Sequence, residues 1–249
     1  TLALGIMPDK IIEFDYQDNG ISDIAFTDNF NTSLNIILRD AYGLPEKFFS
    51  INLYDNYENI LVFNQSKTKK LFYLYNQGKR EIEAIEVDCE KISFRRRIIY
   101  SDGPIEDMAV KPDLERGAIV YILYSQNGSL YYQQYFRSEE KYITRSSDVL
   151  TKNFSNAFFI NLTYPTIGYF SLENDNSILN TVESRRENLQ SKKHYQINKN
   201  YNSLYTITSL GNFSGDRSFY SVVSYNNQQK IFFNNTITDE IYQYSPTYV

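Results

Sequence analysis

The chain of 249 residues contains no tryptophan, one histidine and one cysteine. Because Cys89 is the only cysteine, the chain has no internal disulfide and no zinc or iron–sulfur centre that needs several cysteines. His194 is the only histidine, so a Ser-His-Asp triad would have to use it, and a two-histidine site is excluded. The formal net charge of −5 is opposite in sign to the charge that holds phosphate backbones. We therefore expect no metal, no cofactor and no nucleic-acid partner.

The sequence also lacks an apolar run of about 18 residues, which is the length that spans a bilayer as a helix. We expect no transmembrane segment. Asn-x-Ser/Thr sequons occur at Asn31, Asn64, Asn127, Asn153, Asn161, Asn212 and Asn234. About four would arise by chance in so asparagine-rich a chain. The excess predicts a secreted or luminal glycoprotein, and biased composition is the competing explanation.

Glycine and proline are scarce, with 10 and 6 residues, whereas tyrosine and phenylalanine are abundant, with 23 and 17. Aromatic side chains are enriched in strands, where they fit a pleated and half-buried surface. No segment has the 3.6-residue apolar stripe of a packed helix. The best candidate, Ser184–Lys193, is polar all round and is predicted to be a loop. These features predict an all-β protein.

Three similar units follow one another in the second half of the chain. They begin near Ile105, Ala157 and Ser203, and each has four short aromatic or β-branched runs separated by turn residues. The central turns lie near residues 127, 175 and 226, so the period is about 50 residues. The Asn127-Gly128 pair predicts a type I′ hairpin, in which both central residues have positive φ.

The first half fits this period less well. Phe48–Tyr54, Ile60–Phe63 and Leu71–Tyr75 are predicted to be the first three strands of a unit, with the fourth strand and an insertion in Lys79–Ser101. Ile21–Thr27 and Leu34–Arg39 are predicted to form a partial unit, and Ile11–Tyr16 a strand that closes the ring. Four-stranded units of 45–55 residues are typical of propeller blades. We therefore predict one β-propeller domain over residues 1–249, with about five blades, and a β-sandwich is the alternative.

One unit carries a family resemblance. The run AIVYILYSQNGSLYYQQYF, Ala118–Phe136, combines a hydrophobic strand, a short polar turn and an aromatic strand. It resembles the repeats of fungal fucose-specific lectins, which are six-bladed propellers that bind sugars between blades, and the resemblance is strongest over residues 104–145. In that family a pocket uses an Arg from one strand, a Glu from the next and aromatic walls. Here the strand before the turn has no Arg, and the next strand has Gln133 in place of Glu. The resemblance therefore implies the layout and not the fucose site.

The aromatic strand of this unit offers candidate ligand-binding residues. Sugar binding needs flat apolar faces for stacking and planar polar groups for hydroxyls. Because side chains alternate along a strand, Tyr131, Gln133, Tyr135 and Arg137 share one face. We predict these four as the ligand-binding residues. The alternative is that the tyrosines pack between blades.

Charged residues give weaker predictions. Arg95 and Arg97 are expected on one face of a strand and Arg96 on the other, with acidic residues such as Glu83 and Glu86 placed upstream to match their charge across strands. A glycosidase would need two carboxylates about 5–9.5 Å apart. Six acids near strand ends are candidates: Asp15, Asp23, Asp28, Glu106, Asp107 and Glu173. Asp23 and Asp107 occupy similar places in strands predicted to be innermost.

Three functions follow in order of preference. The first is a secreted, non-enzymatic propeller that binds carbohydrate on a glycan or glycoprotein surface. The second is a propeller that binds a protein partner through one contiguous apolar patch. The third is a glycoside hydrolase that uses a carboxylate pair.

Overall fold

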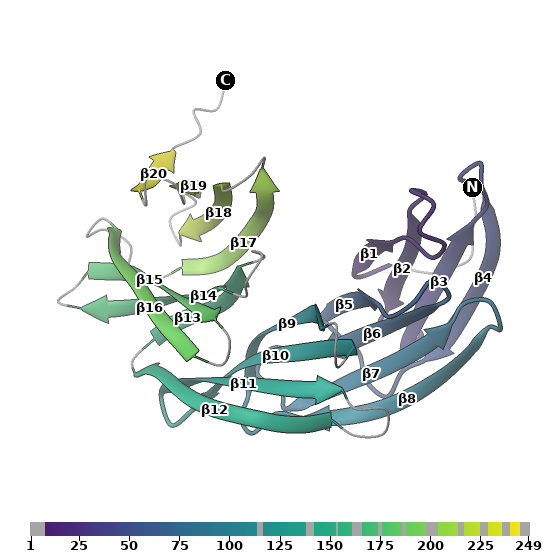
Figure 1. Ribbon diagram of the computed structural model, residues 1–249, viewed down its shortest axis with the longest axis horizontal. Coiled ribbons are helices and arrows are strands. Elements are labelled where there is room, and N and C mark those ends of the chain that lie inside the picture. Colours follow the sequence, from purple (N-terminus) through teal and green to yellow (C-terminus); the bar gives the residue numbers. More distant parts are fainter. Residues whose placement is uncertain are drawn as a thin grey trace. The chain divides into compact units, whose positions relative to one another are not determined.

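The protein is all-β, with its strands in antiparallel sheets (Figure 1). The computed structural model describes residues 8–113, 117–137, 142–152, 154–160, 166–173, 176–185, 188–197, 204–213, 217–224, 229–235 and 240–244. In these residues there are five four-stranded sheets, and each consists of four consecutive strands paired in chain order.

The strands have the following bounds. Sheet 1 contains β1 (Ile11–Phe14), β2 (Asp23–Asp28), β3 (Ser33–Arg39) and β4 (Pro45–Asn52). Sheet 2 contains β5 (Asn59–Asn64), β6 (Lys69–Tyr75), β7 (Glu81–Asp88) and β8 (Ser93–Tyr100). Sheet 3 contains β9 (Ile105–Asp113), β10 (Gly117–Gln126), β11 (Ser129–Arg137) and β12 (Tyr142–Lys152). Sheet 4 contains β13 (Phe154–Ile160), β14 (Thr166–Glu173), β15 (Asn176–Arg185) and β16 (Asn188–Ile197). Sheet 5 contains β17 (Leu204–Phe213), β18 (Arg217–Ser224), β19 (Gln229–Asn235) and β20 (Glu240–Tyr244).

The three repeated units of the second half are confirmed as sheets 3, 4 and 5. The division of the first half is wrong by one strand. Pro45–Asn52 is the last strand of sheet 1 and not the first strand of sheet 2, and Lys79–Ser101 holds two strands rather than one with an insertion. Ile11–Phe14 pairs with β2, so sheet 1 is complete and not a partial unit.

The polar segment Ser184–Lys193 was predicted to be a loop, and this is wrong for most of its length. It ends β15 at Arg185 and begins β16 at Asn188, and the two strands pair there through Ser184 opposite Leu189. A polar strand can form when its neighbour supplies the backbone hydrogen bonds, because pairing satisfies the main chain whatever the side chains are.

Sheets 1 and 2 pack against each other through one hydrophobic core. The Phe14 and Phe72 rings meet edge to face with centroids 5.5 Å apart, which joins β1 to β6. Alternate residues of β3 and β7 point into this core, as a half-buried strand requires. Its other buried members include Leu34, Ile36, Leu38, Ile51, Tyr57, Leu74, Ile85, Val87 and Cys89.

The segment that links β8 to β9 is tied to the β6–β7 hairpin by backbone hydrogen bonds. Gly78 N–H donates to the Ile105 carbonyl at 2.8 Å, and Ile105 N–H donates to Lys79 at 2.8 Å. Ser101 N–H also donates to the Arg80 carbonyl. The linker before sheet 3 is therefore fixed to sheet 2 by main-chain contacts that do not depend on the side chains.

The chain divides into two compact units. One comprises Thr1–Ile105, Ala109–Tyr124 and Tyr132–Asp148, and the other comprises Glu106–Met108, Ser125–Tyr131 and Val149–Val249. The strands of sheet 3 contribute to both units. The single propeller domain over 1–249 therefore stays a prediction.

Candidate ligand-binding groove

An open groove lies between the last strands of sheets 1 and 2, in the first unit of the chain. Its volume is about 440 Å³, and it is lined by Ser50, Ile51, Asn52, Tyr54, Phe94 and Arg96. Strands β4 and β8 are both edge strands, each paired on one side only within its sheet. The groove is therefore formed where two sheets meet and where neither sheet covers the other's edge.

Arg96 forms the centre of this groove. Its Nε lies 2.8 Å from Glu83 Oε1, and its Nη2 donates to the carbonyl oxygen of Asn52. The guanidinium carbon lies 4.3 Å from the centre of the Tyr54 ring, a cation–π distance. These contacts hold the guanidinium in one position.

Two aromatic rings lie close to the Arg96 guanidinium. The Phe94 ring centre lies 5.7 Å from the guanidinium carbon, and Tyr54 provides the nearer ring. Tyr54 is 68% exposed and Phe94 49% exposed, which is unusual for large apolar rings in a folded chain. The groove thus presents flat apolar faces next to planar hydrogen-bond donors.

Glu83 supports the groove from beneath. Its side chain is fully buried, and Oε2 accepts a hydrogen bond from the backbone N–H of Tyr54 at 3.1 Å. Burial, and then the charge of Glu83 and a hydrogen bond to it, raise the pKa of Tyr57 above its ordinary value. Glu83 therefore contacts both Arg96 and the backbone of Tyr54, which are two walls of the groove.

The groove offers a ligand hydrogen-bonding groups but no carboxylate. None of its six lining residues carries a carboxylate, and the Glu83 carboxylate behind Arg96 is fully buried. Ser50 and Asn52 are exposed and supply a hydroxyl and an amide. Arg96 lines the groove with a side-chain exposure of 17%.

The residues predicted from the sequence lie elsewhere, on β11. Gln133 is fully buried, and its Nε2 donates to Asp102 Oδ2 at 2.9 Å. Tyr135 is 6% exposed and its hydroxyl donates to the Tyr100 carbonyl. Tyr131 is half-buried, and the side chain of Arg137 lies outside the described part of the structure. Gln133 thus contacts the linker between sheets 2 and 3, and Tyr135 contacts the last residue of β8. A ligand-binding role for the four residues stays a prediction.

Glu83 and Gln133 have equivalent places in two successive sheets. Both lie on the third strand, and both accept a backbone N–H from the linker that precedes their sheet. The donor is Tyr54 for Glu83 and Asp102 for Gln133, each two residues past the end of a fourth strand. The predicted residue Gln133 is thus the counterpart, in sheet 3, of the glutamate that supports the groove in sheet 2.

The arginine run on β8 lies as predicted. Arg96 is opposite Ile85 in the β7–β8 pair, and Arg95 is opposite Glu86, so Arg96 alone faces sheet 1. The predicted charge match across strands is confirmed by the Arg96–Glu83 ion pair. The exposed rings of Tyr54 and Phe94 were missed, because a strand sequence does not show which edge of a sheet is left uncovered.

Two of the six carboxylates considered for catalysis, Asp23 and Asp107, hold backbone groups. Asp23 Oδ2 accepts from Tyr16 N–H at 2.6 Å and Oδ1 accepts from Arg39 N–H at 2.7 Å. Asp107 Oδ2 accepts from Phe159 N–H at 2.6 Å. The predicted equivalence of Asp23 and Asp107 is wrong, since Asp23 is on the second strand of its sheet and Asp107 on the first.

Asp15 and Asp28 have similar roles in turns. Asp15 accepts from the backbone of Gln17, Asn19 and Gly20. Desolvation acts to raise its pKa, but these hydrogen bonds together hold the pKa below its ordinary value. A general acid needs the opposite shift. Asp28 accepts from the N–H of Phe30 and Asn31.

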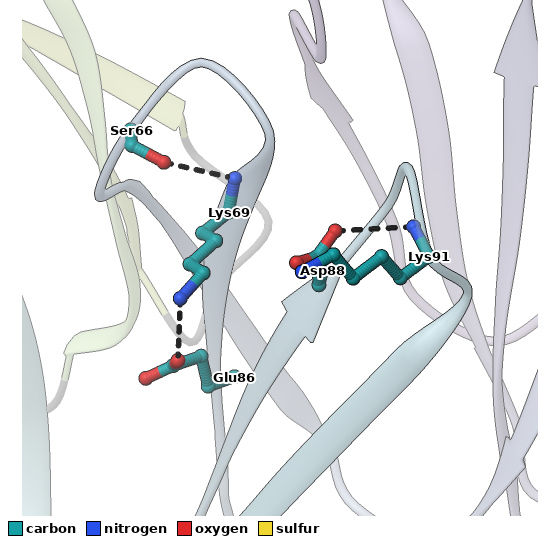
Figure 2. A network of polar contacts seen from close by, with 5 residues as sticks. All are labelled: Ser66, Lys69, Glu86, Asp88 and Lys91. Carbon is teal, nitrogen blue, oxygen red and sulfur yellow. Dashed lines mark hydrogen bonds and ion pairs between the residues drawn. The ribbon is translucent and has the colours of Figure 1, made fainter.

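A polar cluster on the other face of sheet 2 contains an ion pair that can be compared with Arg96–Glu83 (Figure 2). Ser66 Oγ accepts from Lys69 N–H at 3.1 Å, and Lys69 Nζ lies 4.0 Å from Glu86 Oε1. Asp88 Oδ1 accepts from Lys91 N–H at 3.1 Å. Figure 2 shows Ser66 and Lys69 at one hairpin and Asp88 and Lys91 at a second. Such an ion pair, long and half-exposed, contributes little stability.

No known protein family matches this chain, and a search of curated proteins gave no match. Among the described residues no helix is long and apolar enough to cross a membrane. In the same part of the chain no three His, Cys, Asp or Glu side chains are grouped as metal ligands would be. The function must therefore be argued from the groove itself.

Proposed function

We propose that the protein is a non-enzymatic, carbohydrate-binding β-propeller. Five meanders of four strands are the units from which propellers are built. The first strands of neighbouring sheets lie beside each other where sheets share a unit, β1 beside β5 and β13 beside β17. Innermost strands meet in this way when sheets are arranged around an axis, and these contacts support five blades.

The groove carries the functional part of the proposal. A pyranose ring has an apolar face that stacks on aromatic rings and hydroxyls that bind planar polar groups. Tyr54 and Phe94 offer the faces, and Arg96 offers donors close to both rings. Their positions are fixed before binding, because Glu83 holds both Arg96 and the Tyr54 backbone. A preorganised site loses less entropy when a ligand binds.

The purified chain is expected to bind glycans on an array, and Tyr54→Ala is expected to weaken that binding by at least about tenfold, since it removes a stacking face. Tyr42→Ala is the matched control, because Tyr42 is 89% exposed and does not line the groove. Affinities would be measured by titration calorimetry. Absence of binding to every glycan by a folded chain, or equal losses in the two variants, would contradict the proposal.

The proposal includes a secreted or luminal location for the protein. The sequon asparagines Asn31, Asn64 and Asn127 are all exposed. Exposed sequons are accessible to glycans, as a secreted or luminal glycoprotein requires. The predicted partner is accordingly a glycan or a glycoprotein surface.

A protein partner remains the second candidate, supported by exposed apolar side chains on the β3–β4 hairpin. Tyr42 is 89% exposed, Leu44 61% and Phe48 45%. A protein partner bound there would be sensitive to Tyr42→Ala and insensitive to Tyr54→Ala, which is the reverse of the order expected for sugar binding. The same pair of variants therefore separates the two functions.

A further inference from the structure

We propose that Glu83 makes the groove electrically neutral, so that the groove selects uncharged saccharides over acidic ones. Glu83 has this effect without touching the ligand, because it lies behind Arg96. This inference rests on the proposed function and adds the ligand class to it. Arg96 is the one cation that lines the groove, and it is paired with the buried carboxylate of Glu83 directly behind it. The proposal depends on this pairing.

The charge balance follows from the distances. Arg96 Nε and Glu83 Oε1 are 2.8 Å apart, and Glu83 is fully excluded from solvent. Neither Ser50, Ile51, Asn52, Tyr54 nor Phe94 carries a charge, so the lining and its support sum to zero. An acidic sugar would lose part of its hydration on entering the groove and find no net positive charge to replace it. A neutral sugar is still expected to receive hydrogen bonds from the guanidinium of Arg96, which lines the groove.

Sheet 3 indicates that Glu83 can be replaced by glutamine without loss of the fold. Gln133 has the equivalent position there, and its Oε1 lies 3.5 Å from the N–H of Asp102 in the linker. A glutamine at position 83 can likewise accept from the N–H of Tyr54. Glu83→Gln should therefore keep the groove's shape and leave the Arg96 charge without its partner.

A matched control lies on the same strand. Glu86 points to the opposite face of β7, toward Lys69, and does not line the groove. Glu86→Gln changes the net charge of the protein by the same amount as Glu83→Gln. A difference in binding between the two variants would therefore result from the position of the removed charge and not from the change in net charge.

The experiment compares neutral saccharides with uronic, sialylated and sulfated saccharides on one array, followed by titration of the best neutral and the best acidic probe. Wild type and Glu86→Gln are expected to prefer neutral probes. Glu83→Gln is expected to raise the ratio of acidic to neutral affinity by about fivefold or more, with an effect that weakens as salt is added.

The outcomes are distinct. Wild-type preference for acidic probes would overturn this inference and leave carbohydrate binding in place, and this measurement holds even if Glu83→Gln fails to fold. An unchanged ratio in folded Glu83→Gln, or an equal change in Glu86→Gln, would also overturn it. Failure of the wild type to bind any saccharide would reject the proposed function instead.

Discussion

Two residues with branched side chains hold left-handed backbone conformations in turns of similar local structure, one between β2 and β3 and the other between β7 and β8. Thr32 has a φ of 48° and Ile92 a φ of 51°, and each directly precedes the strand that completes a hairpin. An aspartate begins both turns and accepts backbone N–H groups within them, Asp28 in one and Asp88 in the other. A branched side chain at positive φ is strained by about 1–2 kcal/mol. The aspartate hydrogen bonds therefore compensate for backbone strain.

Ile92→Gly is expected to raise the free energy of unfolding by about 0.5 kcal/mol, because glycine removes the strain at a small cost in chain entropy. Ile11→Gly is a matched control, since Ile11 is similarly exposed but lies in strand β1. That change is expected to lower stability by about 0.5–1 kcal/mol. Urea unfolding would measure both. A loss of stability in both variants would show that Ile92 is not strained.

Only some of the residues with positive φ could be predicted from the sequence. The Asn127-Gly128 turn was predicted and is confirmed, with φ of 51° and 73°. In the described part, the other residues with positive φ that are not glycine are Asp18, Thr32 and Ile92. A branched residue gives no local signal for positive φ, because its conformation is imposed by the hydrogen bonds of the turn around it.

At the scale of a strand pair, Gly168 makes room for an aromatic ring. Phe158 on β13 lies opposite Gly168 on β14, and both are buried. A Cβ atom at position 168 would lie 2.4 Å from Phe158 Cζ, far inside van der Waals contact. The ring therefore occupies the space that a side chain at 168 would need, and glycine is required by packing and not by its backbone angles.

Gly168→Ala is expected to destabilise the protein by about 1–3 kcal/mol, because the Phe158 ring must move in a packed interior. Phe158→Leu in the same chain should recover part of that loss, with a coupling free energy of about 1 kcal/mol. Chemical denaturation of the two single variants and the double variant would measure it. Strictly additive losses would show that the ring and the glycine do not compete for one space.

Strand composition predicted the elements better than their grouping. Nearly every aromatic or β-branched run became a strand, because period-2 patterns and turn residues are local signals. In the first half the boundary between sheets was misplaced by one strand, since Phe48 and Phe49 on β4 look like residues of any other strand. The first strand of a sheet can be distinguished from the last strand of the preceding sheet only by the strand with which it pairs. The sequence of a single strand does not predict that partner.

At the scale of the whole molecule, the groove depends on the two sheets being packed as one body. Tyr54 and Asn52 belong to sheet 1 and its linker, whereas Arg96, Phe94 and Glu83 belong to sheet 2. The sequence predicted the pairing of arginine and glutamate, which are on neighbouring strands. It could not predict that Tyr54 joins them, because that contact depends on how one sheet meets the next.

Phe14→Ala tests whether sheets 1 and 2 unfold as one unit. Phe14 is buried in the shared core against Phe72, so its truncation is expected to cost about 3–5 kcal/mol. Amides of β2 and β3 in sheet 1 and of β6 and β7 in sheet 2 should then lose hydrogen-exchange protection by equal amounts, because opening either sheet exposes the same core.

Phe30→Ala is the control, since Phe30 is 84% exposed in the β2–β3 hairpin and should leave protection in both sheets unchanged. Faster exchange confined to sheet 1 in Phe14→Ala would mean that the two sheets open independently. The groove would then not persist while one sheet is open, and saccharide affinity should fall with the stability of sheet 1 alone. Equal loss in both sheets instead makes the groove as stable as the core beneath it, which is the condition for a preorganised site.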